Sequence, residues 1–236
     1  MSIGYVVNES EVEARAEDGT AQAKVTIDRS SGCERLEQRV LRFSQGRSEE
    51  RHTGDRQELL FVADGRGTLE AGGAAHVLEP DTGVFLVPGE TWSIDNPGPE
   101  DLMLVSVTAP CEGHRRTGLT VRYADRPALP ATPNREFRLL VDEDLGCLDV
   151  TQFVGLIPPG RAPLHSHSYD EVVYVVDGEG VLHLGGRDTP LAPGSCIHLP
   201  PLQEHCLENT GPTPMRVLGV FHPSGSPASK ASEANE

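Results

Sequence analysis

Three histidines and one glutamate in the second half of this chain of 236 residues are of the types that hold metal ions: His165, His167, Glu171 and His205. Residues two positions apart on a β-strand point to the same face, so His165 and His167 can bind one ion together. Along a straight strand Glu171 would lie about 13 Å beyond His167, too far to share that ion. The chain must therefore bend between them, and Ser168-Tyr169-Asp170 has the composition of a turn.

An internal repeat relates these residues to the first half of the chain. At a fixed offset of 113 positions, 18 of the 59 residues from 52 to 110 are identical to their counterparts. The N-terminal copy keeps His52 and Glu58, but Gly54 and Trp92 replace the second and third histidines. Glycine has no ligating side chain, and an indole offers only an N–H donor. The sequence thus predicts a metal site in the C-terminal copy and a degenerate one in the N-terminal copy.

Both copies consist of short apolar runs separated by turn residues. Asp64-Gly65 and Asp177-Gly178 each follow such a run and predict tight hairpins, since glycine adopts positive φ without a Cβ clash. Gly72-Gly73 and Gly185-Gly186 predict the next turn in each copy. Strands at this spacing are typical of an antiparallel sandwich or barrel.

Composition limits the partners and the compartment. The formal net charge of −16 opposes binding to nucleic acid or to an anionic membrane surface. No apolar run approaches the roughly 20 residues that span a bilayer, and the N-terminus lacks the pattern of a signal peptide, so we expect a cytoplasmic protein. Five cysteines without a C-x-x-C pair indicate reduced thiols rather than disulfides or a zinc knuckle.

Two strings in the C-terminal half resemble the two conserved motifs of the cupin family. The first contains a glycine, two histidines, a glutamate and a second glycine, with one residue fewer than usual after the first glycine: Gly160, His165, His167, Glu171 and Gly178. The second runs from Gly194 through Pro200 to His205 and Asn209, with Leu202 in place of the usual glycine. The N-terminal half keeps the scaffold of the pattern without the full ligand set.

By this resemblance the chain is identified as a bicupin with two cupin_2-type barrels, an all-β fold of two double-stranded β-helix (jelly-roll) barrels. We expect the N-terminal barrel at residues 1–118, a linker at 119–135, the metal-binding barrel at 136–223 and a disordered tail at 224–236. Residues 119 to 123 of the linker could form an extra strand. The resemblance also implies that His165, His167, Glu171 and His205 bind one divalent metal, and that a homodimer is possible.

Three imidazoles and one carboxylate leave two open positions on an octahedral ion. Such a site favours Fe, Mn, Ni or Co over zinc, whose structural sites are closed. A small-molecule substrate with two adjacent oxygens could chelate the ion there. The leading hypothesis is a dioxygenase-type oxidoreductase. The alternatives are a non-redox isomerase, decarboxylase or aminohydrolase, and a metal-containing binding module without turnover.

Other candidate residues are harder to place from sequence. Glu171, His198 and His183 are the candidates for catalysis, although the sequence does not say which barrel face the two histidines occupy. By alternation along its strand, Tyr174 is expected to face away from the site. Tyr169 is expected in a solvated loop, with a place at the barrel mouth as the alternative. Trp92 is expected to fill the mouth of the N-terminal barrel, with the lining of a small-molecule pocket as the alternative.

Overall fold

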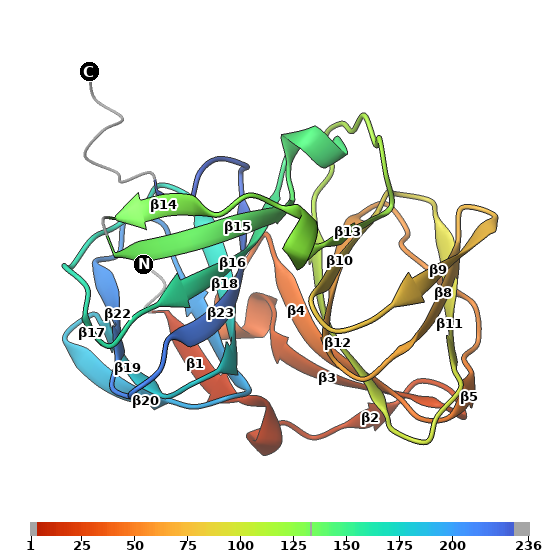
Figure 1. Cartoon of the computed structure of the whole chain (residues 1–236), viewed down its shortest axis with the longest axis horizontal. Helices are drawn as coiled ribbons and strands as arrows, with labels where there is room; N and C mark the ends of the chain where they lie inside the picture. Colours follow the sequence, from red (N-terminus) through yellow and green to blue (C-terminus); the bar gives the residue numbers. More distant parts are fainter. Residues whose placement is uncertain (1–3, 133, 229–236) are drawn as a thin grey trace.

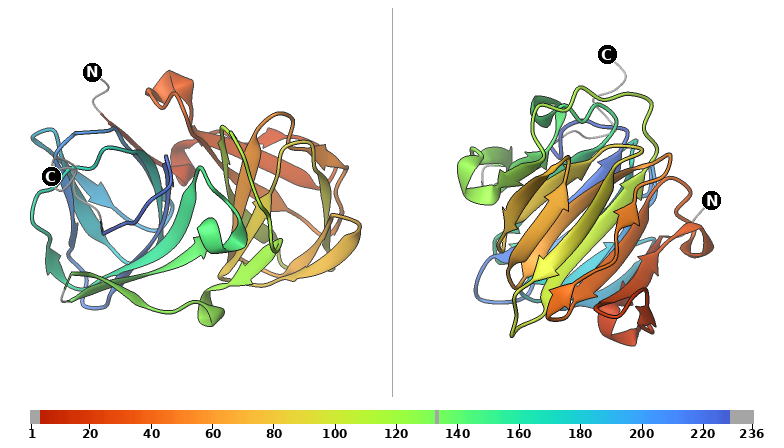
Figure 2. Two further views of the ribbon diagram at one scale, coloured as in Figure 1. Left: turned by 90° about the horizontal axis from the view of Figure 1, so that it is seen from above. Right: turned by 90° about the vertical axis from the view of Figure 1, so that its right-hand side faces the viewer.

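The computed structural model describes residues 4–132 and 134–228, which fold into two β-barrels that lie side by side (Figures 1 and 2). Each barrel has a seven-stranded sheet facing a smaller one, and all strand pairs are antiparallel. Four short 3-10 helices are present: η1 (Glu9–Glu11), η2 (Arg29–Ser31), η3 (Tyr123–Asp125) and η4 (Glu143–Leu145). The structure confirms the predicted all-β fold of two barrels.

In the described residues, the N-terminal barrel consists of two sheets with twelve strands in total. Its larger sheet has the order β13-β10-β7-β12-β4-β3-β2, with β2 (Arg15–Ala16), β3 (Ala21–Ile27), β4 (Glu37–Phe43), β7 (Gln57–Asp64), β10 (Thr82–Leu86), β12 (Leu102–Ala109) and β13 (Thr120–Arg122). Its smaller sheet has the order β5-β11-β8-β9, with β6 also paired to β11: β5 (Gly46–Arg47), β6 (Arg51–His52), β8 (Gly67–Ala71), β9 (Ala74–Leu78) and β11 (Thr91–Asn96).

The C-terminal barrel repeats this plan. Its larger sheet has the order β1-β21-β18-β23-β16-β15-β14, with β1 (Tyr5–Asn8), β14 (Leu129–Thr132), β15 (Arg135–Val141), β16 (Thr151–Ile157), β18 (Asp170–Asp177), β21 (Ser195–Leu199) and β23 (Met215–His222). Its smaller sheet has the order β17-β22-β19-β20, with β17 (Gly160–Arg161), β19 (Gly180–Leu184), β20 (Arg187–Leu191) and β22 (His205–Asn209).

The two barrels exchange strands, which the expected division of the chain does not describe. Strand β1 precedes the N-terminal barrel but pairs with β21 of the C-terminal barrel, where it is the red strand among blue ones in Figure 1. Strand β13, in the expected linker, pairs with β10 of the N-terminal barrel. Each exchanged strand covers a sheet edge that would otherwise present unpaired backbone groups. The expected linker therefore also carries regular structure, β13, η3 and β14.

The glycine turns serve two different purposes. Gly72-Gly73 joins β8 to its hydrogen-bonded neighbour β9, and Gly185-Gly186 joins β19 to β20, so both are hairpin turns as expected. The prediction of hairpins at Asp64-Gly65 and Asp177-Gly178 was wrong, because these turns lead from one sheet to the other. The bend still requires glycine: Gly65 has φ +80°, and a Cβ there would lie 2.3 Å from the Asp101 carbonyl oxygen.

The larger sheets pack against each other through a core shared by both barrels, which includes Phe61 and Phe85 from one side and Val172 and Tyr174 from the other. Side chains alternate along β18, so Val172 and Tyr174 join this core while Val173 joins the interior of the C-terminal barrel. Tyr174 thus faces away from the barrel interior, as its position relative to Glu171 predicts.

The start of the expected tail is ordered. Thr151 and Gly225 exchange two hydrogen bonds of 3.1 Å through the threonine hydroxyl, and Ala228 packs against an aromatic cluster of the C-terminal barrel. The expectation of disorder is therefore wrong for residues 224–228, and its remainder, 229–236, lies outside the described residues. These contacts bring Pro227 to the mouth of that barrel.

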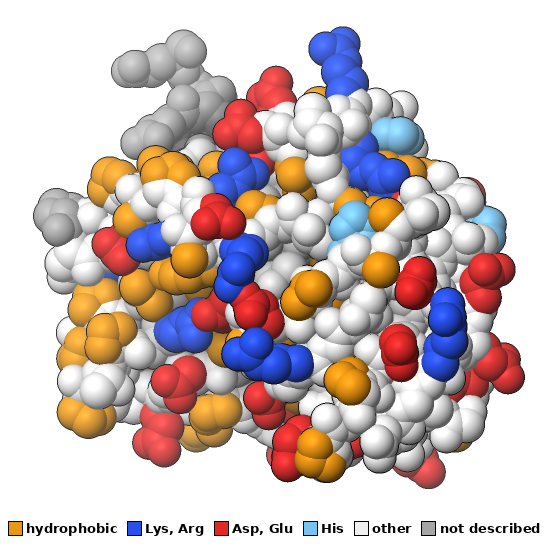
Figure 3. Space-filling model, turned by 45° about the vertical axis from the view of Figure 1, so that its right-hand side comes forward, with side chains coloured by type: hydrophobic (Ala, Val, Ile, Leu, Met, Phe, Trp, Pro, Cys, Tyr) orange, Lys and Arg blue, Asp and Glu red, His pale blue; other side chains and the backbone are white. Residues whose placement is uncertain are grey.

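The outer surface carries mixed charge. On the face in Figure 3, acidic and basic side chains are interspersed. Among the described residues, no helix has the length and hydrophobicity needed to cross a membrane.

Candidate metal centre in the C-terminal barrel

Three of the four expected ligands converge inside the C-terminal barrel. Ligand atoms of His167, Glu171 and His205 all lie within 4.8 Å of one another, and all three residues are buried. The expected bend is present at Ser168 and Tyr169, just before β18 begins, and it turns Glu171 back toward His167. The bend therefore brings Glu171 close enough to His167 for the two side chains to share one ion, as their spacing in the sequence requires.

The geometry of this group fits a metal ion. The Nε2 atom of His167 lies 2.9 Å from the Oε2 atom of Glu171. Neighbouring ligand atoms of an octahedral ion with bonds of about 2.1 Å are about 3 Å apart, so the two atoms are spaced as ligands of one ion. The Nε2 atom of His167 is buried and has no hydrogen-bond partner among the described residues. A bound cation would satisfy this atom.

Backbone carbonyls orient the imidazoles. The Nδ1 atom of His167 lies 2.9 Å from the Tyr169 carbonyl oxygen, and Nδ1 of His205 lies 2.9 Å from the Gln203 carbonyl oxygen. With the ring N–H donating to each carbonyl, the tautomer is fixed and the Nε2 lone pair remains available to a metal ion.

His165 lies beside this group rather than within it. Its backbone forms two hydrogen bonds with His205, of 3.0 and 2.9 Å, and the two ring centroids are 4.6 Å apart. Its side chain also lines the same cavity. The pairing of these backbones explains how a residue far along the chain reaches the first histidine motif. The role of His165 as fourth ligand remains a prediction.

His205 is held in its neutral form. Burial, which is the largest cause, together with His167 and His165 lowers its pKa to about 4. A neutral imidazole is the form that binds metal, so protons do not compete at this residue near neutral pH.

This pKa predicts how pH affects the metal-free protein. His205 stays neutral in the folded chain but takes up a proton near pH 6.5 when unfolded, so stability falls as pH drops from about 6.5 to 4. The loss attributable to His205 is at most about 3 kcal/mol. Urea unfolding of chelator-treated protein across this range measures the slope. A His205→Gln variant with the wild-type slope would contradict the prediction.

The ligands open onto a small cavity of about 120 Å³, below the roughly 300–1,000 Å³ of typical ligand pockets. Phe137 and Phe153 form part of its wall, and Tyr169 stacks between His167 and Phe221 with centroid distances of 4.0 and 4.1 Å. Tyr169 is therefore buried rather than solvated as expected. Burial, and then Glu171, raise the pKa of its hydroxyl, so this group stays protonated.

One cationic side chain, Arg135, lines the cavity, and no sequence pattern predicts it. Arg135 begins β15, which places its guanidinium at the cavity wall. One of its N–H groups donates to the Leu207 carbonyl oxygen at 3.1 Å. A guanidinium has five N–H donors in a planar fork that suits a carboxylate. Arg135 falls at the end of the expected linker, where neither a motif nor the repeat marks it.

The structure does not bring the other two catalytic candidates to the metal cavity. His198 lies on β21 next to Leu199, and since Leu199 lines the cavity, alternation sends His198 to the opposite face. His183 on β19 contacts two carboxylates instead, Asp188 at 2.6 Å and Glu208 at 2.8 Å. Of the three candidates, only Glu171 is in the cavity.

The turn before His205 keeps its shape without the usual glycine. Leu202 has φ +62°, in the left-handed region that disfavours side chains with a Cβ. Its backbone N–H donates to the His167 carbonyl oxygen at 2.7 Å, and its side chain is exposed. This hydrogen bond links the two histidine motifs directly, so the substitution at Leu202 leaves the placement of the ligands intact.

In the N-terminal barrel, aromatic packing fills the corresponding space. Trp92 is buried, packs edge-on against Phe43 with centroids 6.4 Å apart, and lies under the Arg51 guanidinium at 5.2 Å. The expected filling of the barrel by Trp92 is therefore what the structure shows. No group of metal-ligating side chains is found in this barrel within residues 4–132.

The remaining carboxylate of the N-terminal copy has a new partner. The Ser106 hydroxyl donates to Glu58 at 2.6 Å, whereas the C-terminal copy has Gly219 at that position, which leaves Glu171 without this bond. Burial is the largest cause that raises the pKa of Glu58, and the Ser106 hydroxyl and Arg39 oppose it.

A Glu58→Gln variant is expected to be more stable than the wild type at neutral pH. A buried carboxyl with a raised pKa stabilises the fold below its unfolded pKa and loses that contribution as pH rises through its folded pKa. The neutral amide avoids this loss, so the free energy of unfolding at neutral pH should rise by on the order of 1 kcal/mol. Urea midpoints at pH 4 and pH 7 measure the effect, which should grow with pH. A variant whose urea midpoint equals that of the wild type at both pH 4 and pH 7 would contradict the prediction.

Comparison with known proteins agrees with this architecture. The family described as "Cupin domain" matches residues 39–108 and 153–221, one match in each barrel. An oxalate-binding protein of Thermotoga maritima is 38% identical over 67 residues, which are 28% of this chain and 55% of that protein. The alignment thus spans about half the length of that relative.

Solved structures show the same two-barrel fold at low sequence identity. The protein Ylba of E. coli has a TM-score of 0.80 and 14% identity, and the match covers 94% of this chain and 91% of that one. An oxalate decarboxylase of Lactobacillus farciminis has a TM-score of 0.78 and 14% identity, with coverages of 94% and 87%. Because the family match falls once in each barrel and includes more than half of the residues, the chain belongs to the cupin family as a bicupin.

Proposed function

We propose that this chain is a metal-dependent enzyme whose C-terminal barrel acts on a small carboxylate that chelates the ion through two oxygens, in the class of oxalate or a 2-oxo acid. The observation that carries the proposal is the combination in one small cavity of the ligand group at His167, Glu171 and His205 with the Arg135 guanidinium. The similarity to an oxalate-binding protein supports the same class of ligand.

The residues of the cavity have separate roles in this proposal. A divalent ion held by the histidines and Glu171 would polarise the oxygens of the substrate as a Lewis acid. Arg135 would bind carboxylate oxygens of the substrate that do not ligate the ion. Tyr169 would donate a hydrogen bond, and Phe137 and Phe153 would exclude water. The volume of about 120 Å³ limits the substrate to a small acid.

The reaction is tested with protein loaded separately with Fe(II), Mn(II), Co(II) or Ni(II). Each form is incubated with oxalate, small 2-oxo acids and catechols, while oxygen uptake and products are measured. Dioxygenase-type oxidation, the leading version, requires oxygen uptake with conversion. Conversion without uptake would instead support the non-redox version, such as decarboxylation. Absence of conversion for all metals and substrates would contradict an enzyme acting on this class.

Replacement of Arg135 tests the substrate class. Arg135→Ala is expected to weaken binding of oxalate about 10- to 100-fold, because a hydrogen-bonded carboxylate loses its charged partner. Arg135→Lys should restore part of the affinity, since it keeps the charge without the planar fork. Calorimetric titration of metal-loaded protein measures both. Unchanged affinity in a folded Arg135→Ala variant would show that the acid binds elsewhere.

Binding without turnover is a second candidate, favoured by the similarity to an oxalate-binding protein. Tight, metal-dependent binding of oxalate together with no conversion in the same preparations would support it over the enzyme.

A further inference from the structure

A second group of metal-ligating side chains lies at the interface between the two barrels. Cys33, Asp170 and His198 offer donor atoms that all lie within 4.8 Å of one another. Cys33 and His198 are each 1% exposed, and Asp170 is 8% exposed. Cys33 follows η2 in the N-terminal half, whereas Asp170 and His198 belong to β18 and β21 of the C-terminal barrel. The group therefore forms only where the barrels meet.

The contacts within this group leave one buried atom unsatisfied. The Cys33 thiol donates to Oδ2 of Asp170 at 3.7 Å, and Nε2 of His198 lies 2.7 Å from Oδ1 of the same carboxylate. The Nδ1 atom of His198 is buried and has no hydrogen-bond partner among the described residues. Such an atom costs free energy unless a ligand satisfies it.

The internal repeat supplies a comparison on the other side of the interface. There Cys147 is buried in the shared core, and its sulfur lies 3.3 Å from Oε1 of Gln57. Gln57 and Phe85 are the counterparts of Asp170 and His198 at the offset of 113. Packing at the interface explains a buried cysteine on each side. It does not explain a carboxylate and an imidazole in place of an amide and a phenyl ring.

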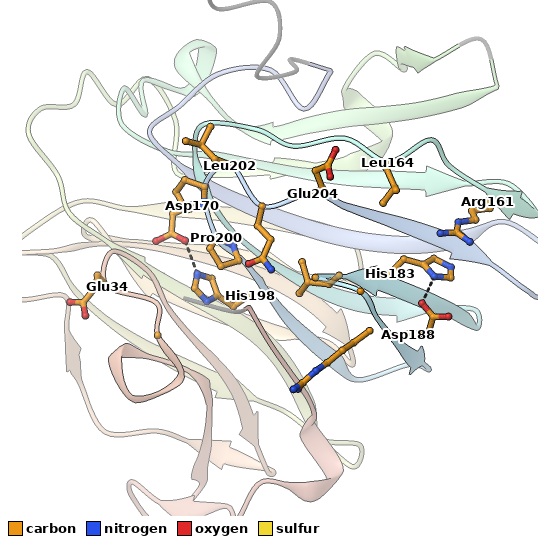
Figure 4. A pocket seen from close by; sticks show the side chains of 17 residues that line it. Glu34, Arg161, Leu164, Asp170, His183, Asp188, His198, Pro200, Leu202 and Glu204 are labelled. Atoms are coloured by element: carbon orange, nitrogen blue, oxygen red, sulfur yellow. Dashed lines mark hydrogen bonds and ion pairs between the residues drawn. The ribbon is translucent and has the colours of Figure 1, made fainter. Parts of the chain in front are cut away.

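A cavity reaches the edge of this buried group. Asp170 and His198 line a cavity of about 980 Å³, together with Gly32 and Glu34 from the N-terminal half. Figure 4 shows the Asp170–His198 pair at one end of this cavity, with Glu34 across from it. The cavity thus offers an ion a path to the pair.

We propose that Cys33, Asp170 and His198 bind a second divalent cation of the zinc class, on the opposite face of β18 from the first site. Thiolate, carboxylate and imidazole are the ligands of zinc sites, and tetrahedral zinc places donor atoms about 3.5 Å apart, close to the 3.7 Å between Cys33 and Asp170. On binding, the S–H bond of Cys33 breaks, a metal–sulfur bond forms and the proton passes to water.

Cobalt(II) tests the site because it reports on its ligands. Metal-free protein is titrated with Co²⁺ alone, and the near-ultraviolet thiolate-to-cobalt absorption band is recorded. The barrel site has only nitrogen and oxygen ligands, so the band reports the interface alone. We expect the band to appear in the wild type and in His167→Ala, which lacks a ligand of the barrel site. Loss of barrel metal or of activity would therefore leave this inference untouched.

Matched variants show which residues bind the ion. Cys33→Ser should lose the band, whereas Cys147→Ser should keep it. The double variant Asp170→Gln with His198→Phe reproduces the residues that pack in the other half, so it is expected to fold and to lose one bound Co²⁺ per chain. A titration of the wild type without the band, or a band that persists in Cys33→Ser, would overturn the proposal.

Discussion

Replacement of His205 by alanine is expected to remove the metal ion from the C-terminal barrel while leaving the fold intact. His205 is 2% exposed, and its ligand atom lies within 4.8 Å of those of His167 and Glu171. Its replacement therefore removes one of the three donor atoms of this group. Even outer partners of metal ligands typically contribute 10- to 100-fold in affinity, so loss of a ligand should exceed about 100-fold. Dialysis followed by elemental analysis should find one ion fewer per chain than in the wild type.

As pH falls from about 6.5 to 4, the metal-free variant should lose less stability than the metal-free wild type. The reason is that burial disfavours the charged form of His205, and this penalty disappears with the imidazole. A His52→Ala variant is the matched control, because His52 is the N-terminal counterpart of His165 and should leave the metal content unchanged. If folded His205→Ala retained the full wild-type metal content, the ion would not be held by this group.

Much of the architecture could be predicted from local signals. The turn glycines recur at one offset and fix the number of repeats, and the spacing of His167 and Glu171 requires the bend that the structure has at Ser168 and Tyr169. Gly54 and Trp92 cannot supply ligands, so the prediction that the N-terminal copy lacks a complete ligand set likewise needs only the sequence. These inferences need only periodicity and the chemistry of single side chains.

What could not be predicted depends on contacts between distant segments. The pairing of β1 with β21 crosses from one barrel to the other, and no local pattern in Tyr5–Asn8 distinguishes this partner. The same holds for Arg135, which reaches the cavity only because β15 joins the larger sheet. His198 and His183 are ambiguous for a related reason: the face to which a strand residue points depends on register, and register is a tertiary property.

Replacement of Trp92 by alanine is expected to lower the free energy of unfolding by about 3–5 kcal/mol, the usual cost of removing a large buried aromatic side chain. Trp92 is 2% exposed and stands at the position that His205 occupies in the other barrel. Its ring packs against Phe43 and under the Arg51 guanidinium, which would lose a cation–π partner as well. The position of a candidate metal ligand in one barrel is thus occupied by an aromatic packing residue in the other.

Urea unfolding followed by circular dichroism measures this effect, since Trp92 is the only tryptophan and fluorescence would be lost with it. Trp92→Phe is the control: it keeps an aromatic ring against Phe43 and should cost less than the alanine variant. Both variants should keep the metal content of the wild type, the reverse of His205→Ala. A Trp92→Ala protein of wild-type stability would mean that the N-terminal barrel does not depend on its aromatic filling. Loss of metal in that variant would mean that metal binding in the C-terminal barrel depends on packing in the N-terminal barrel.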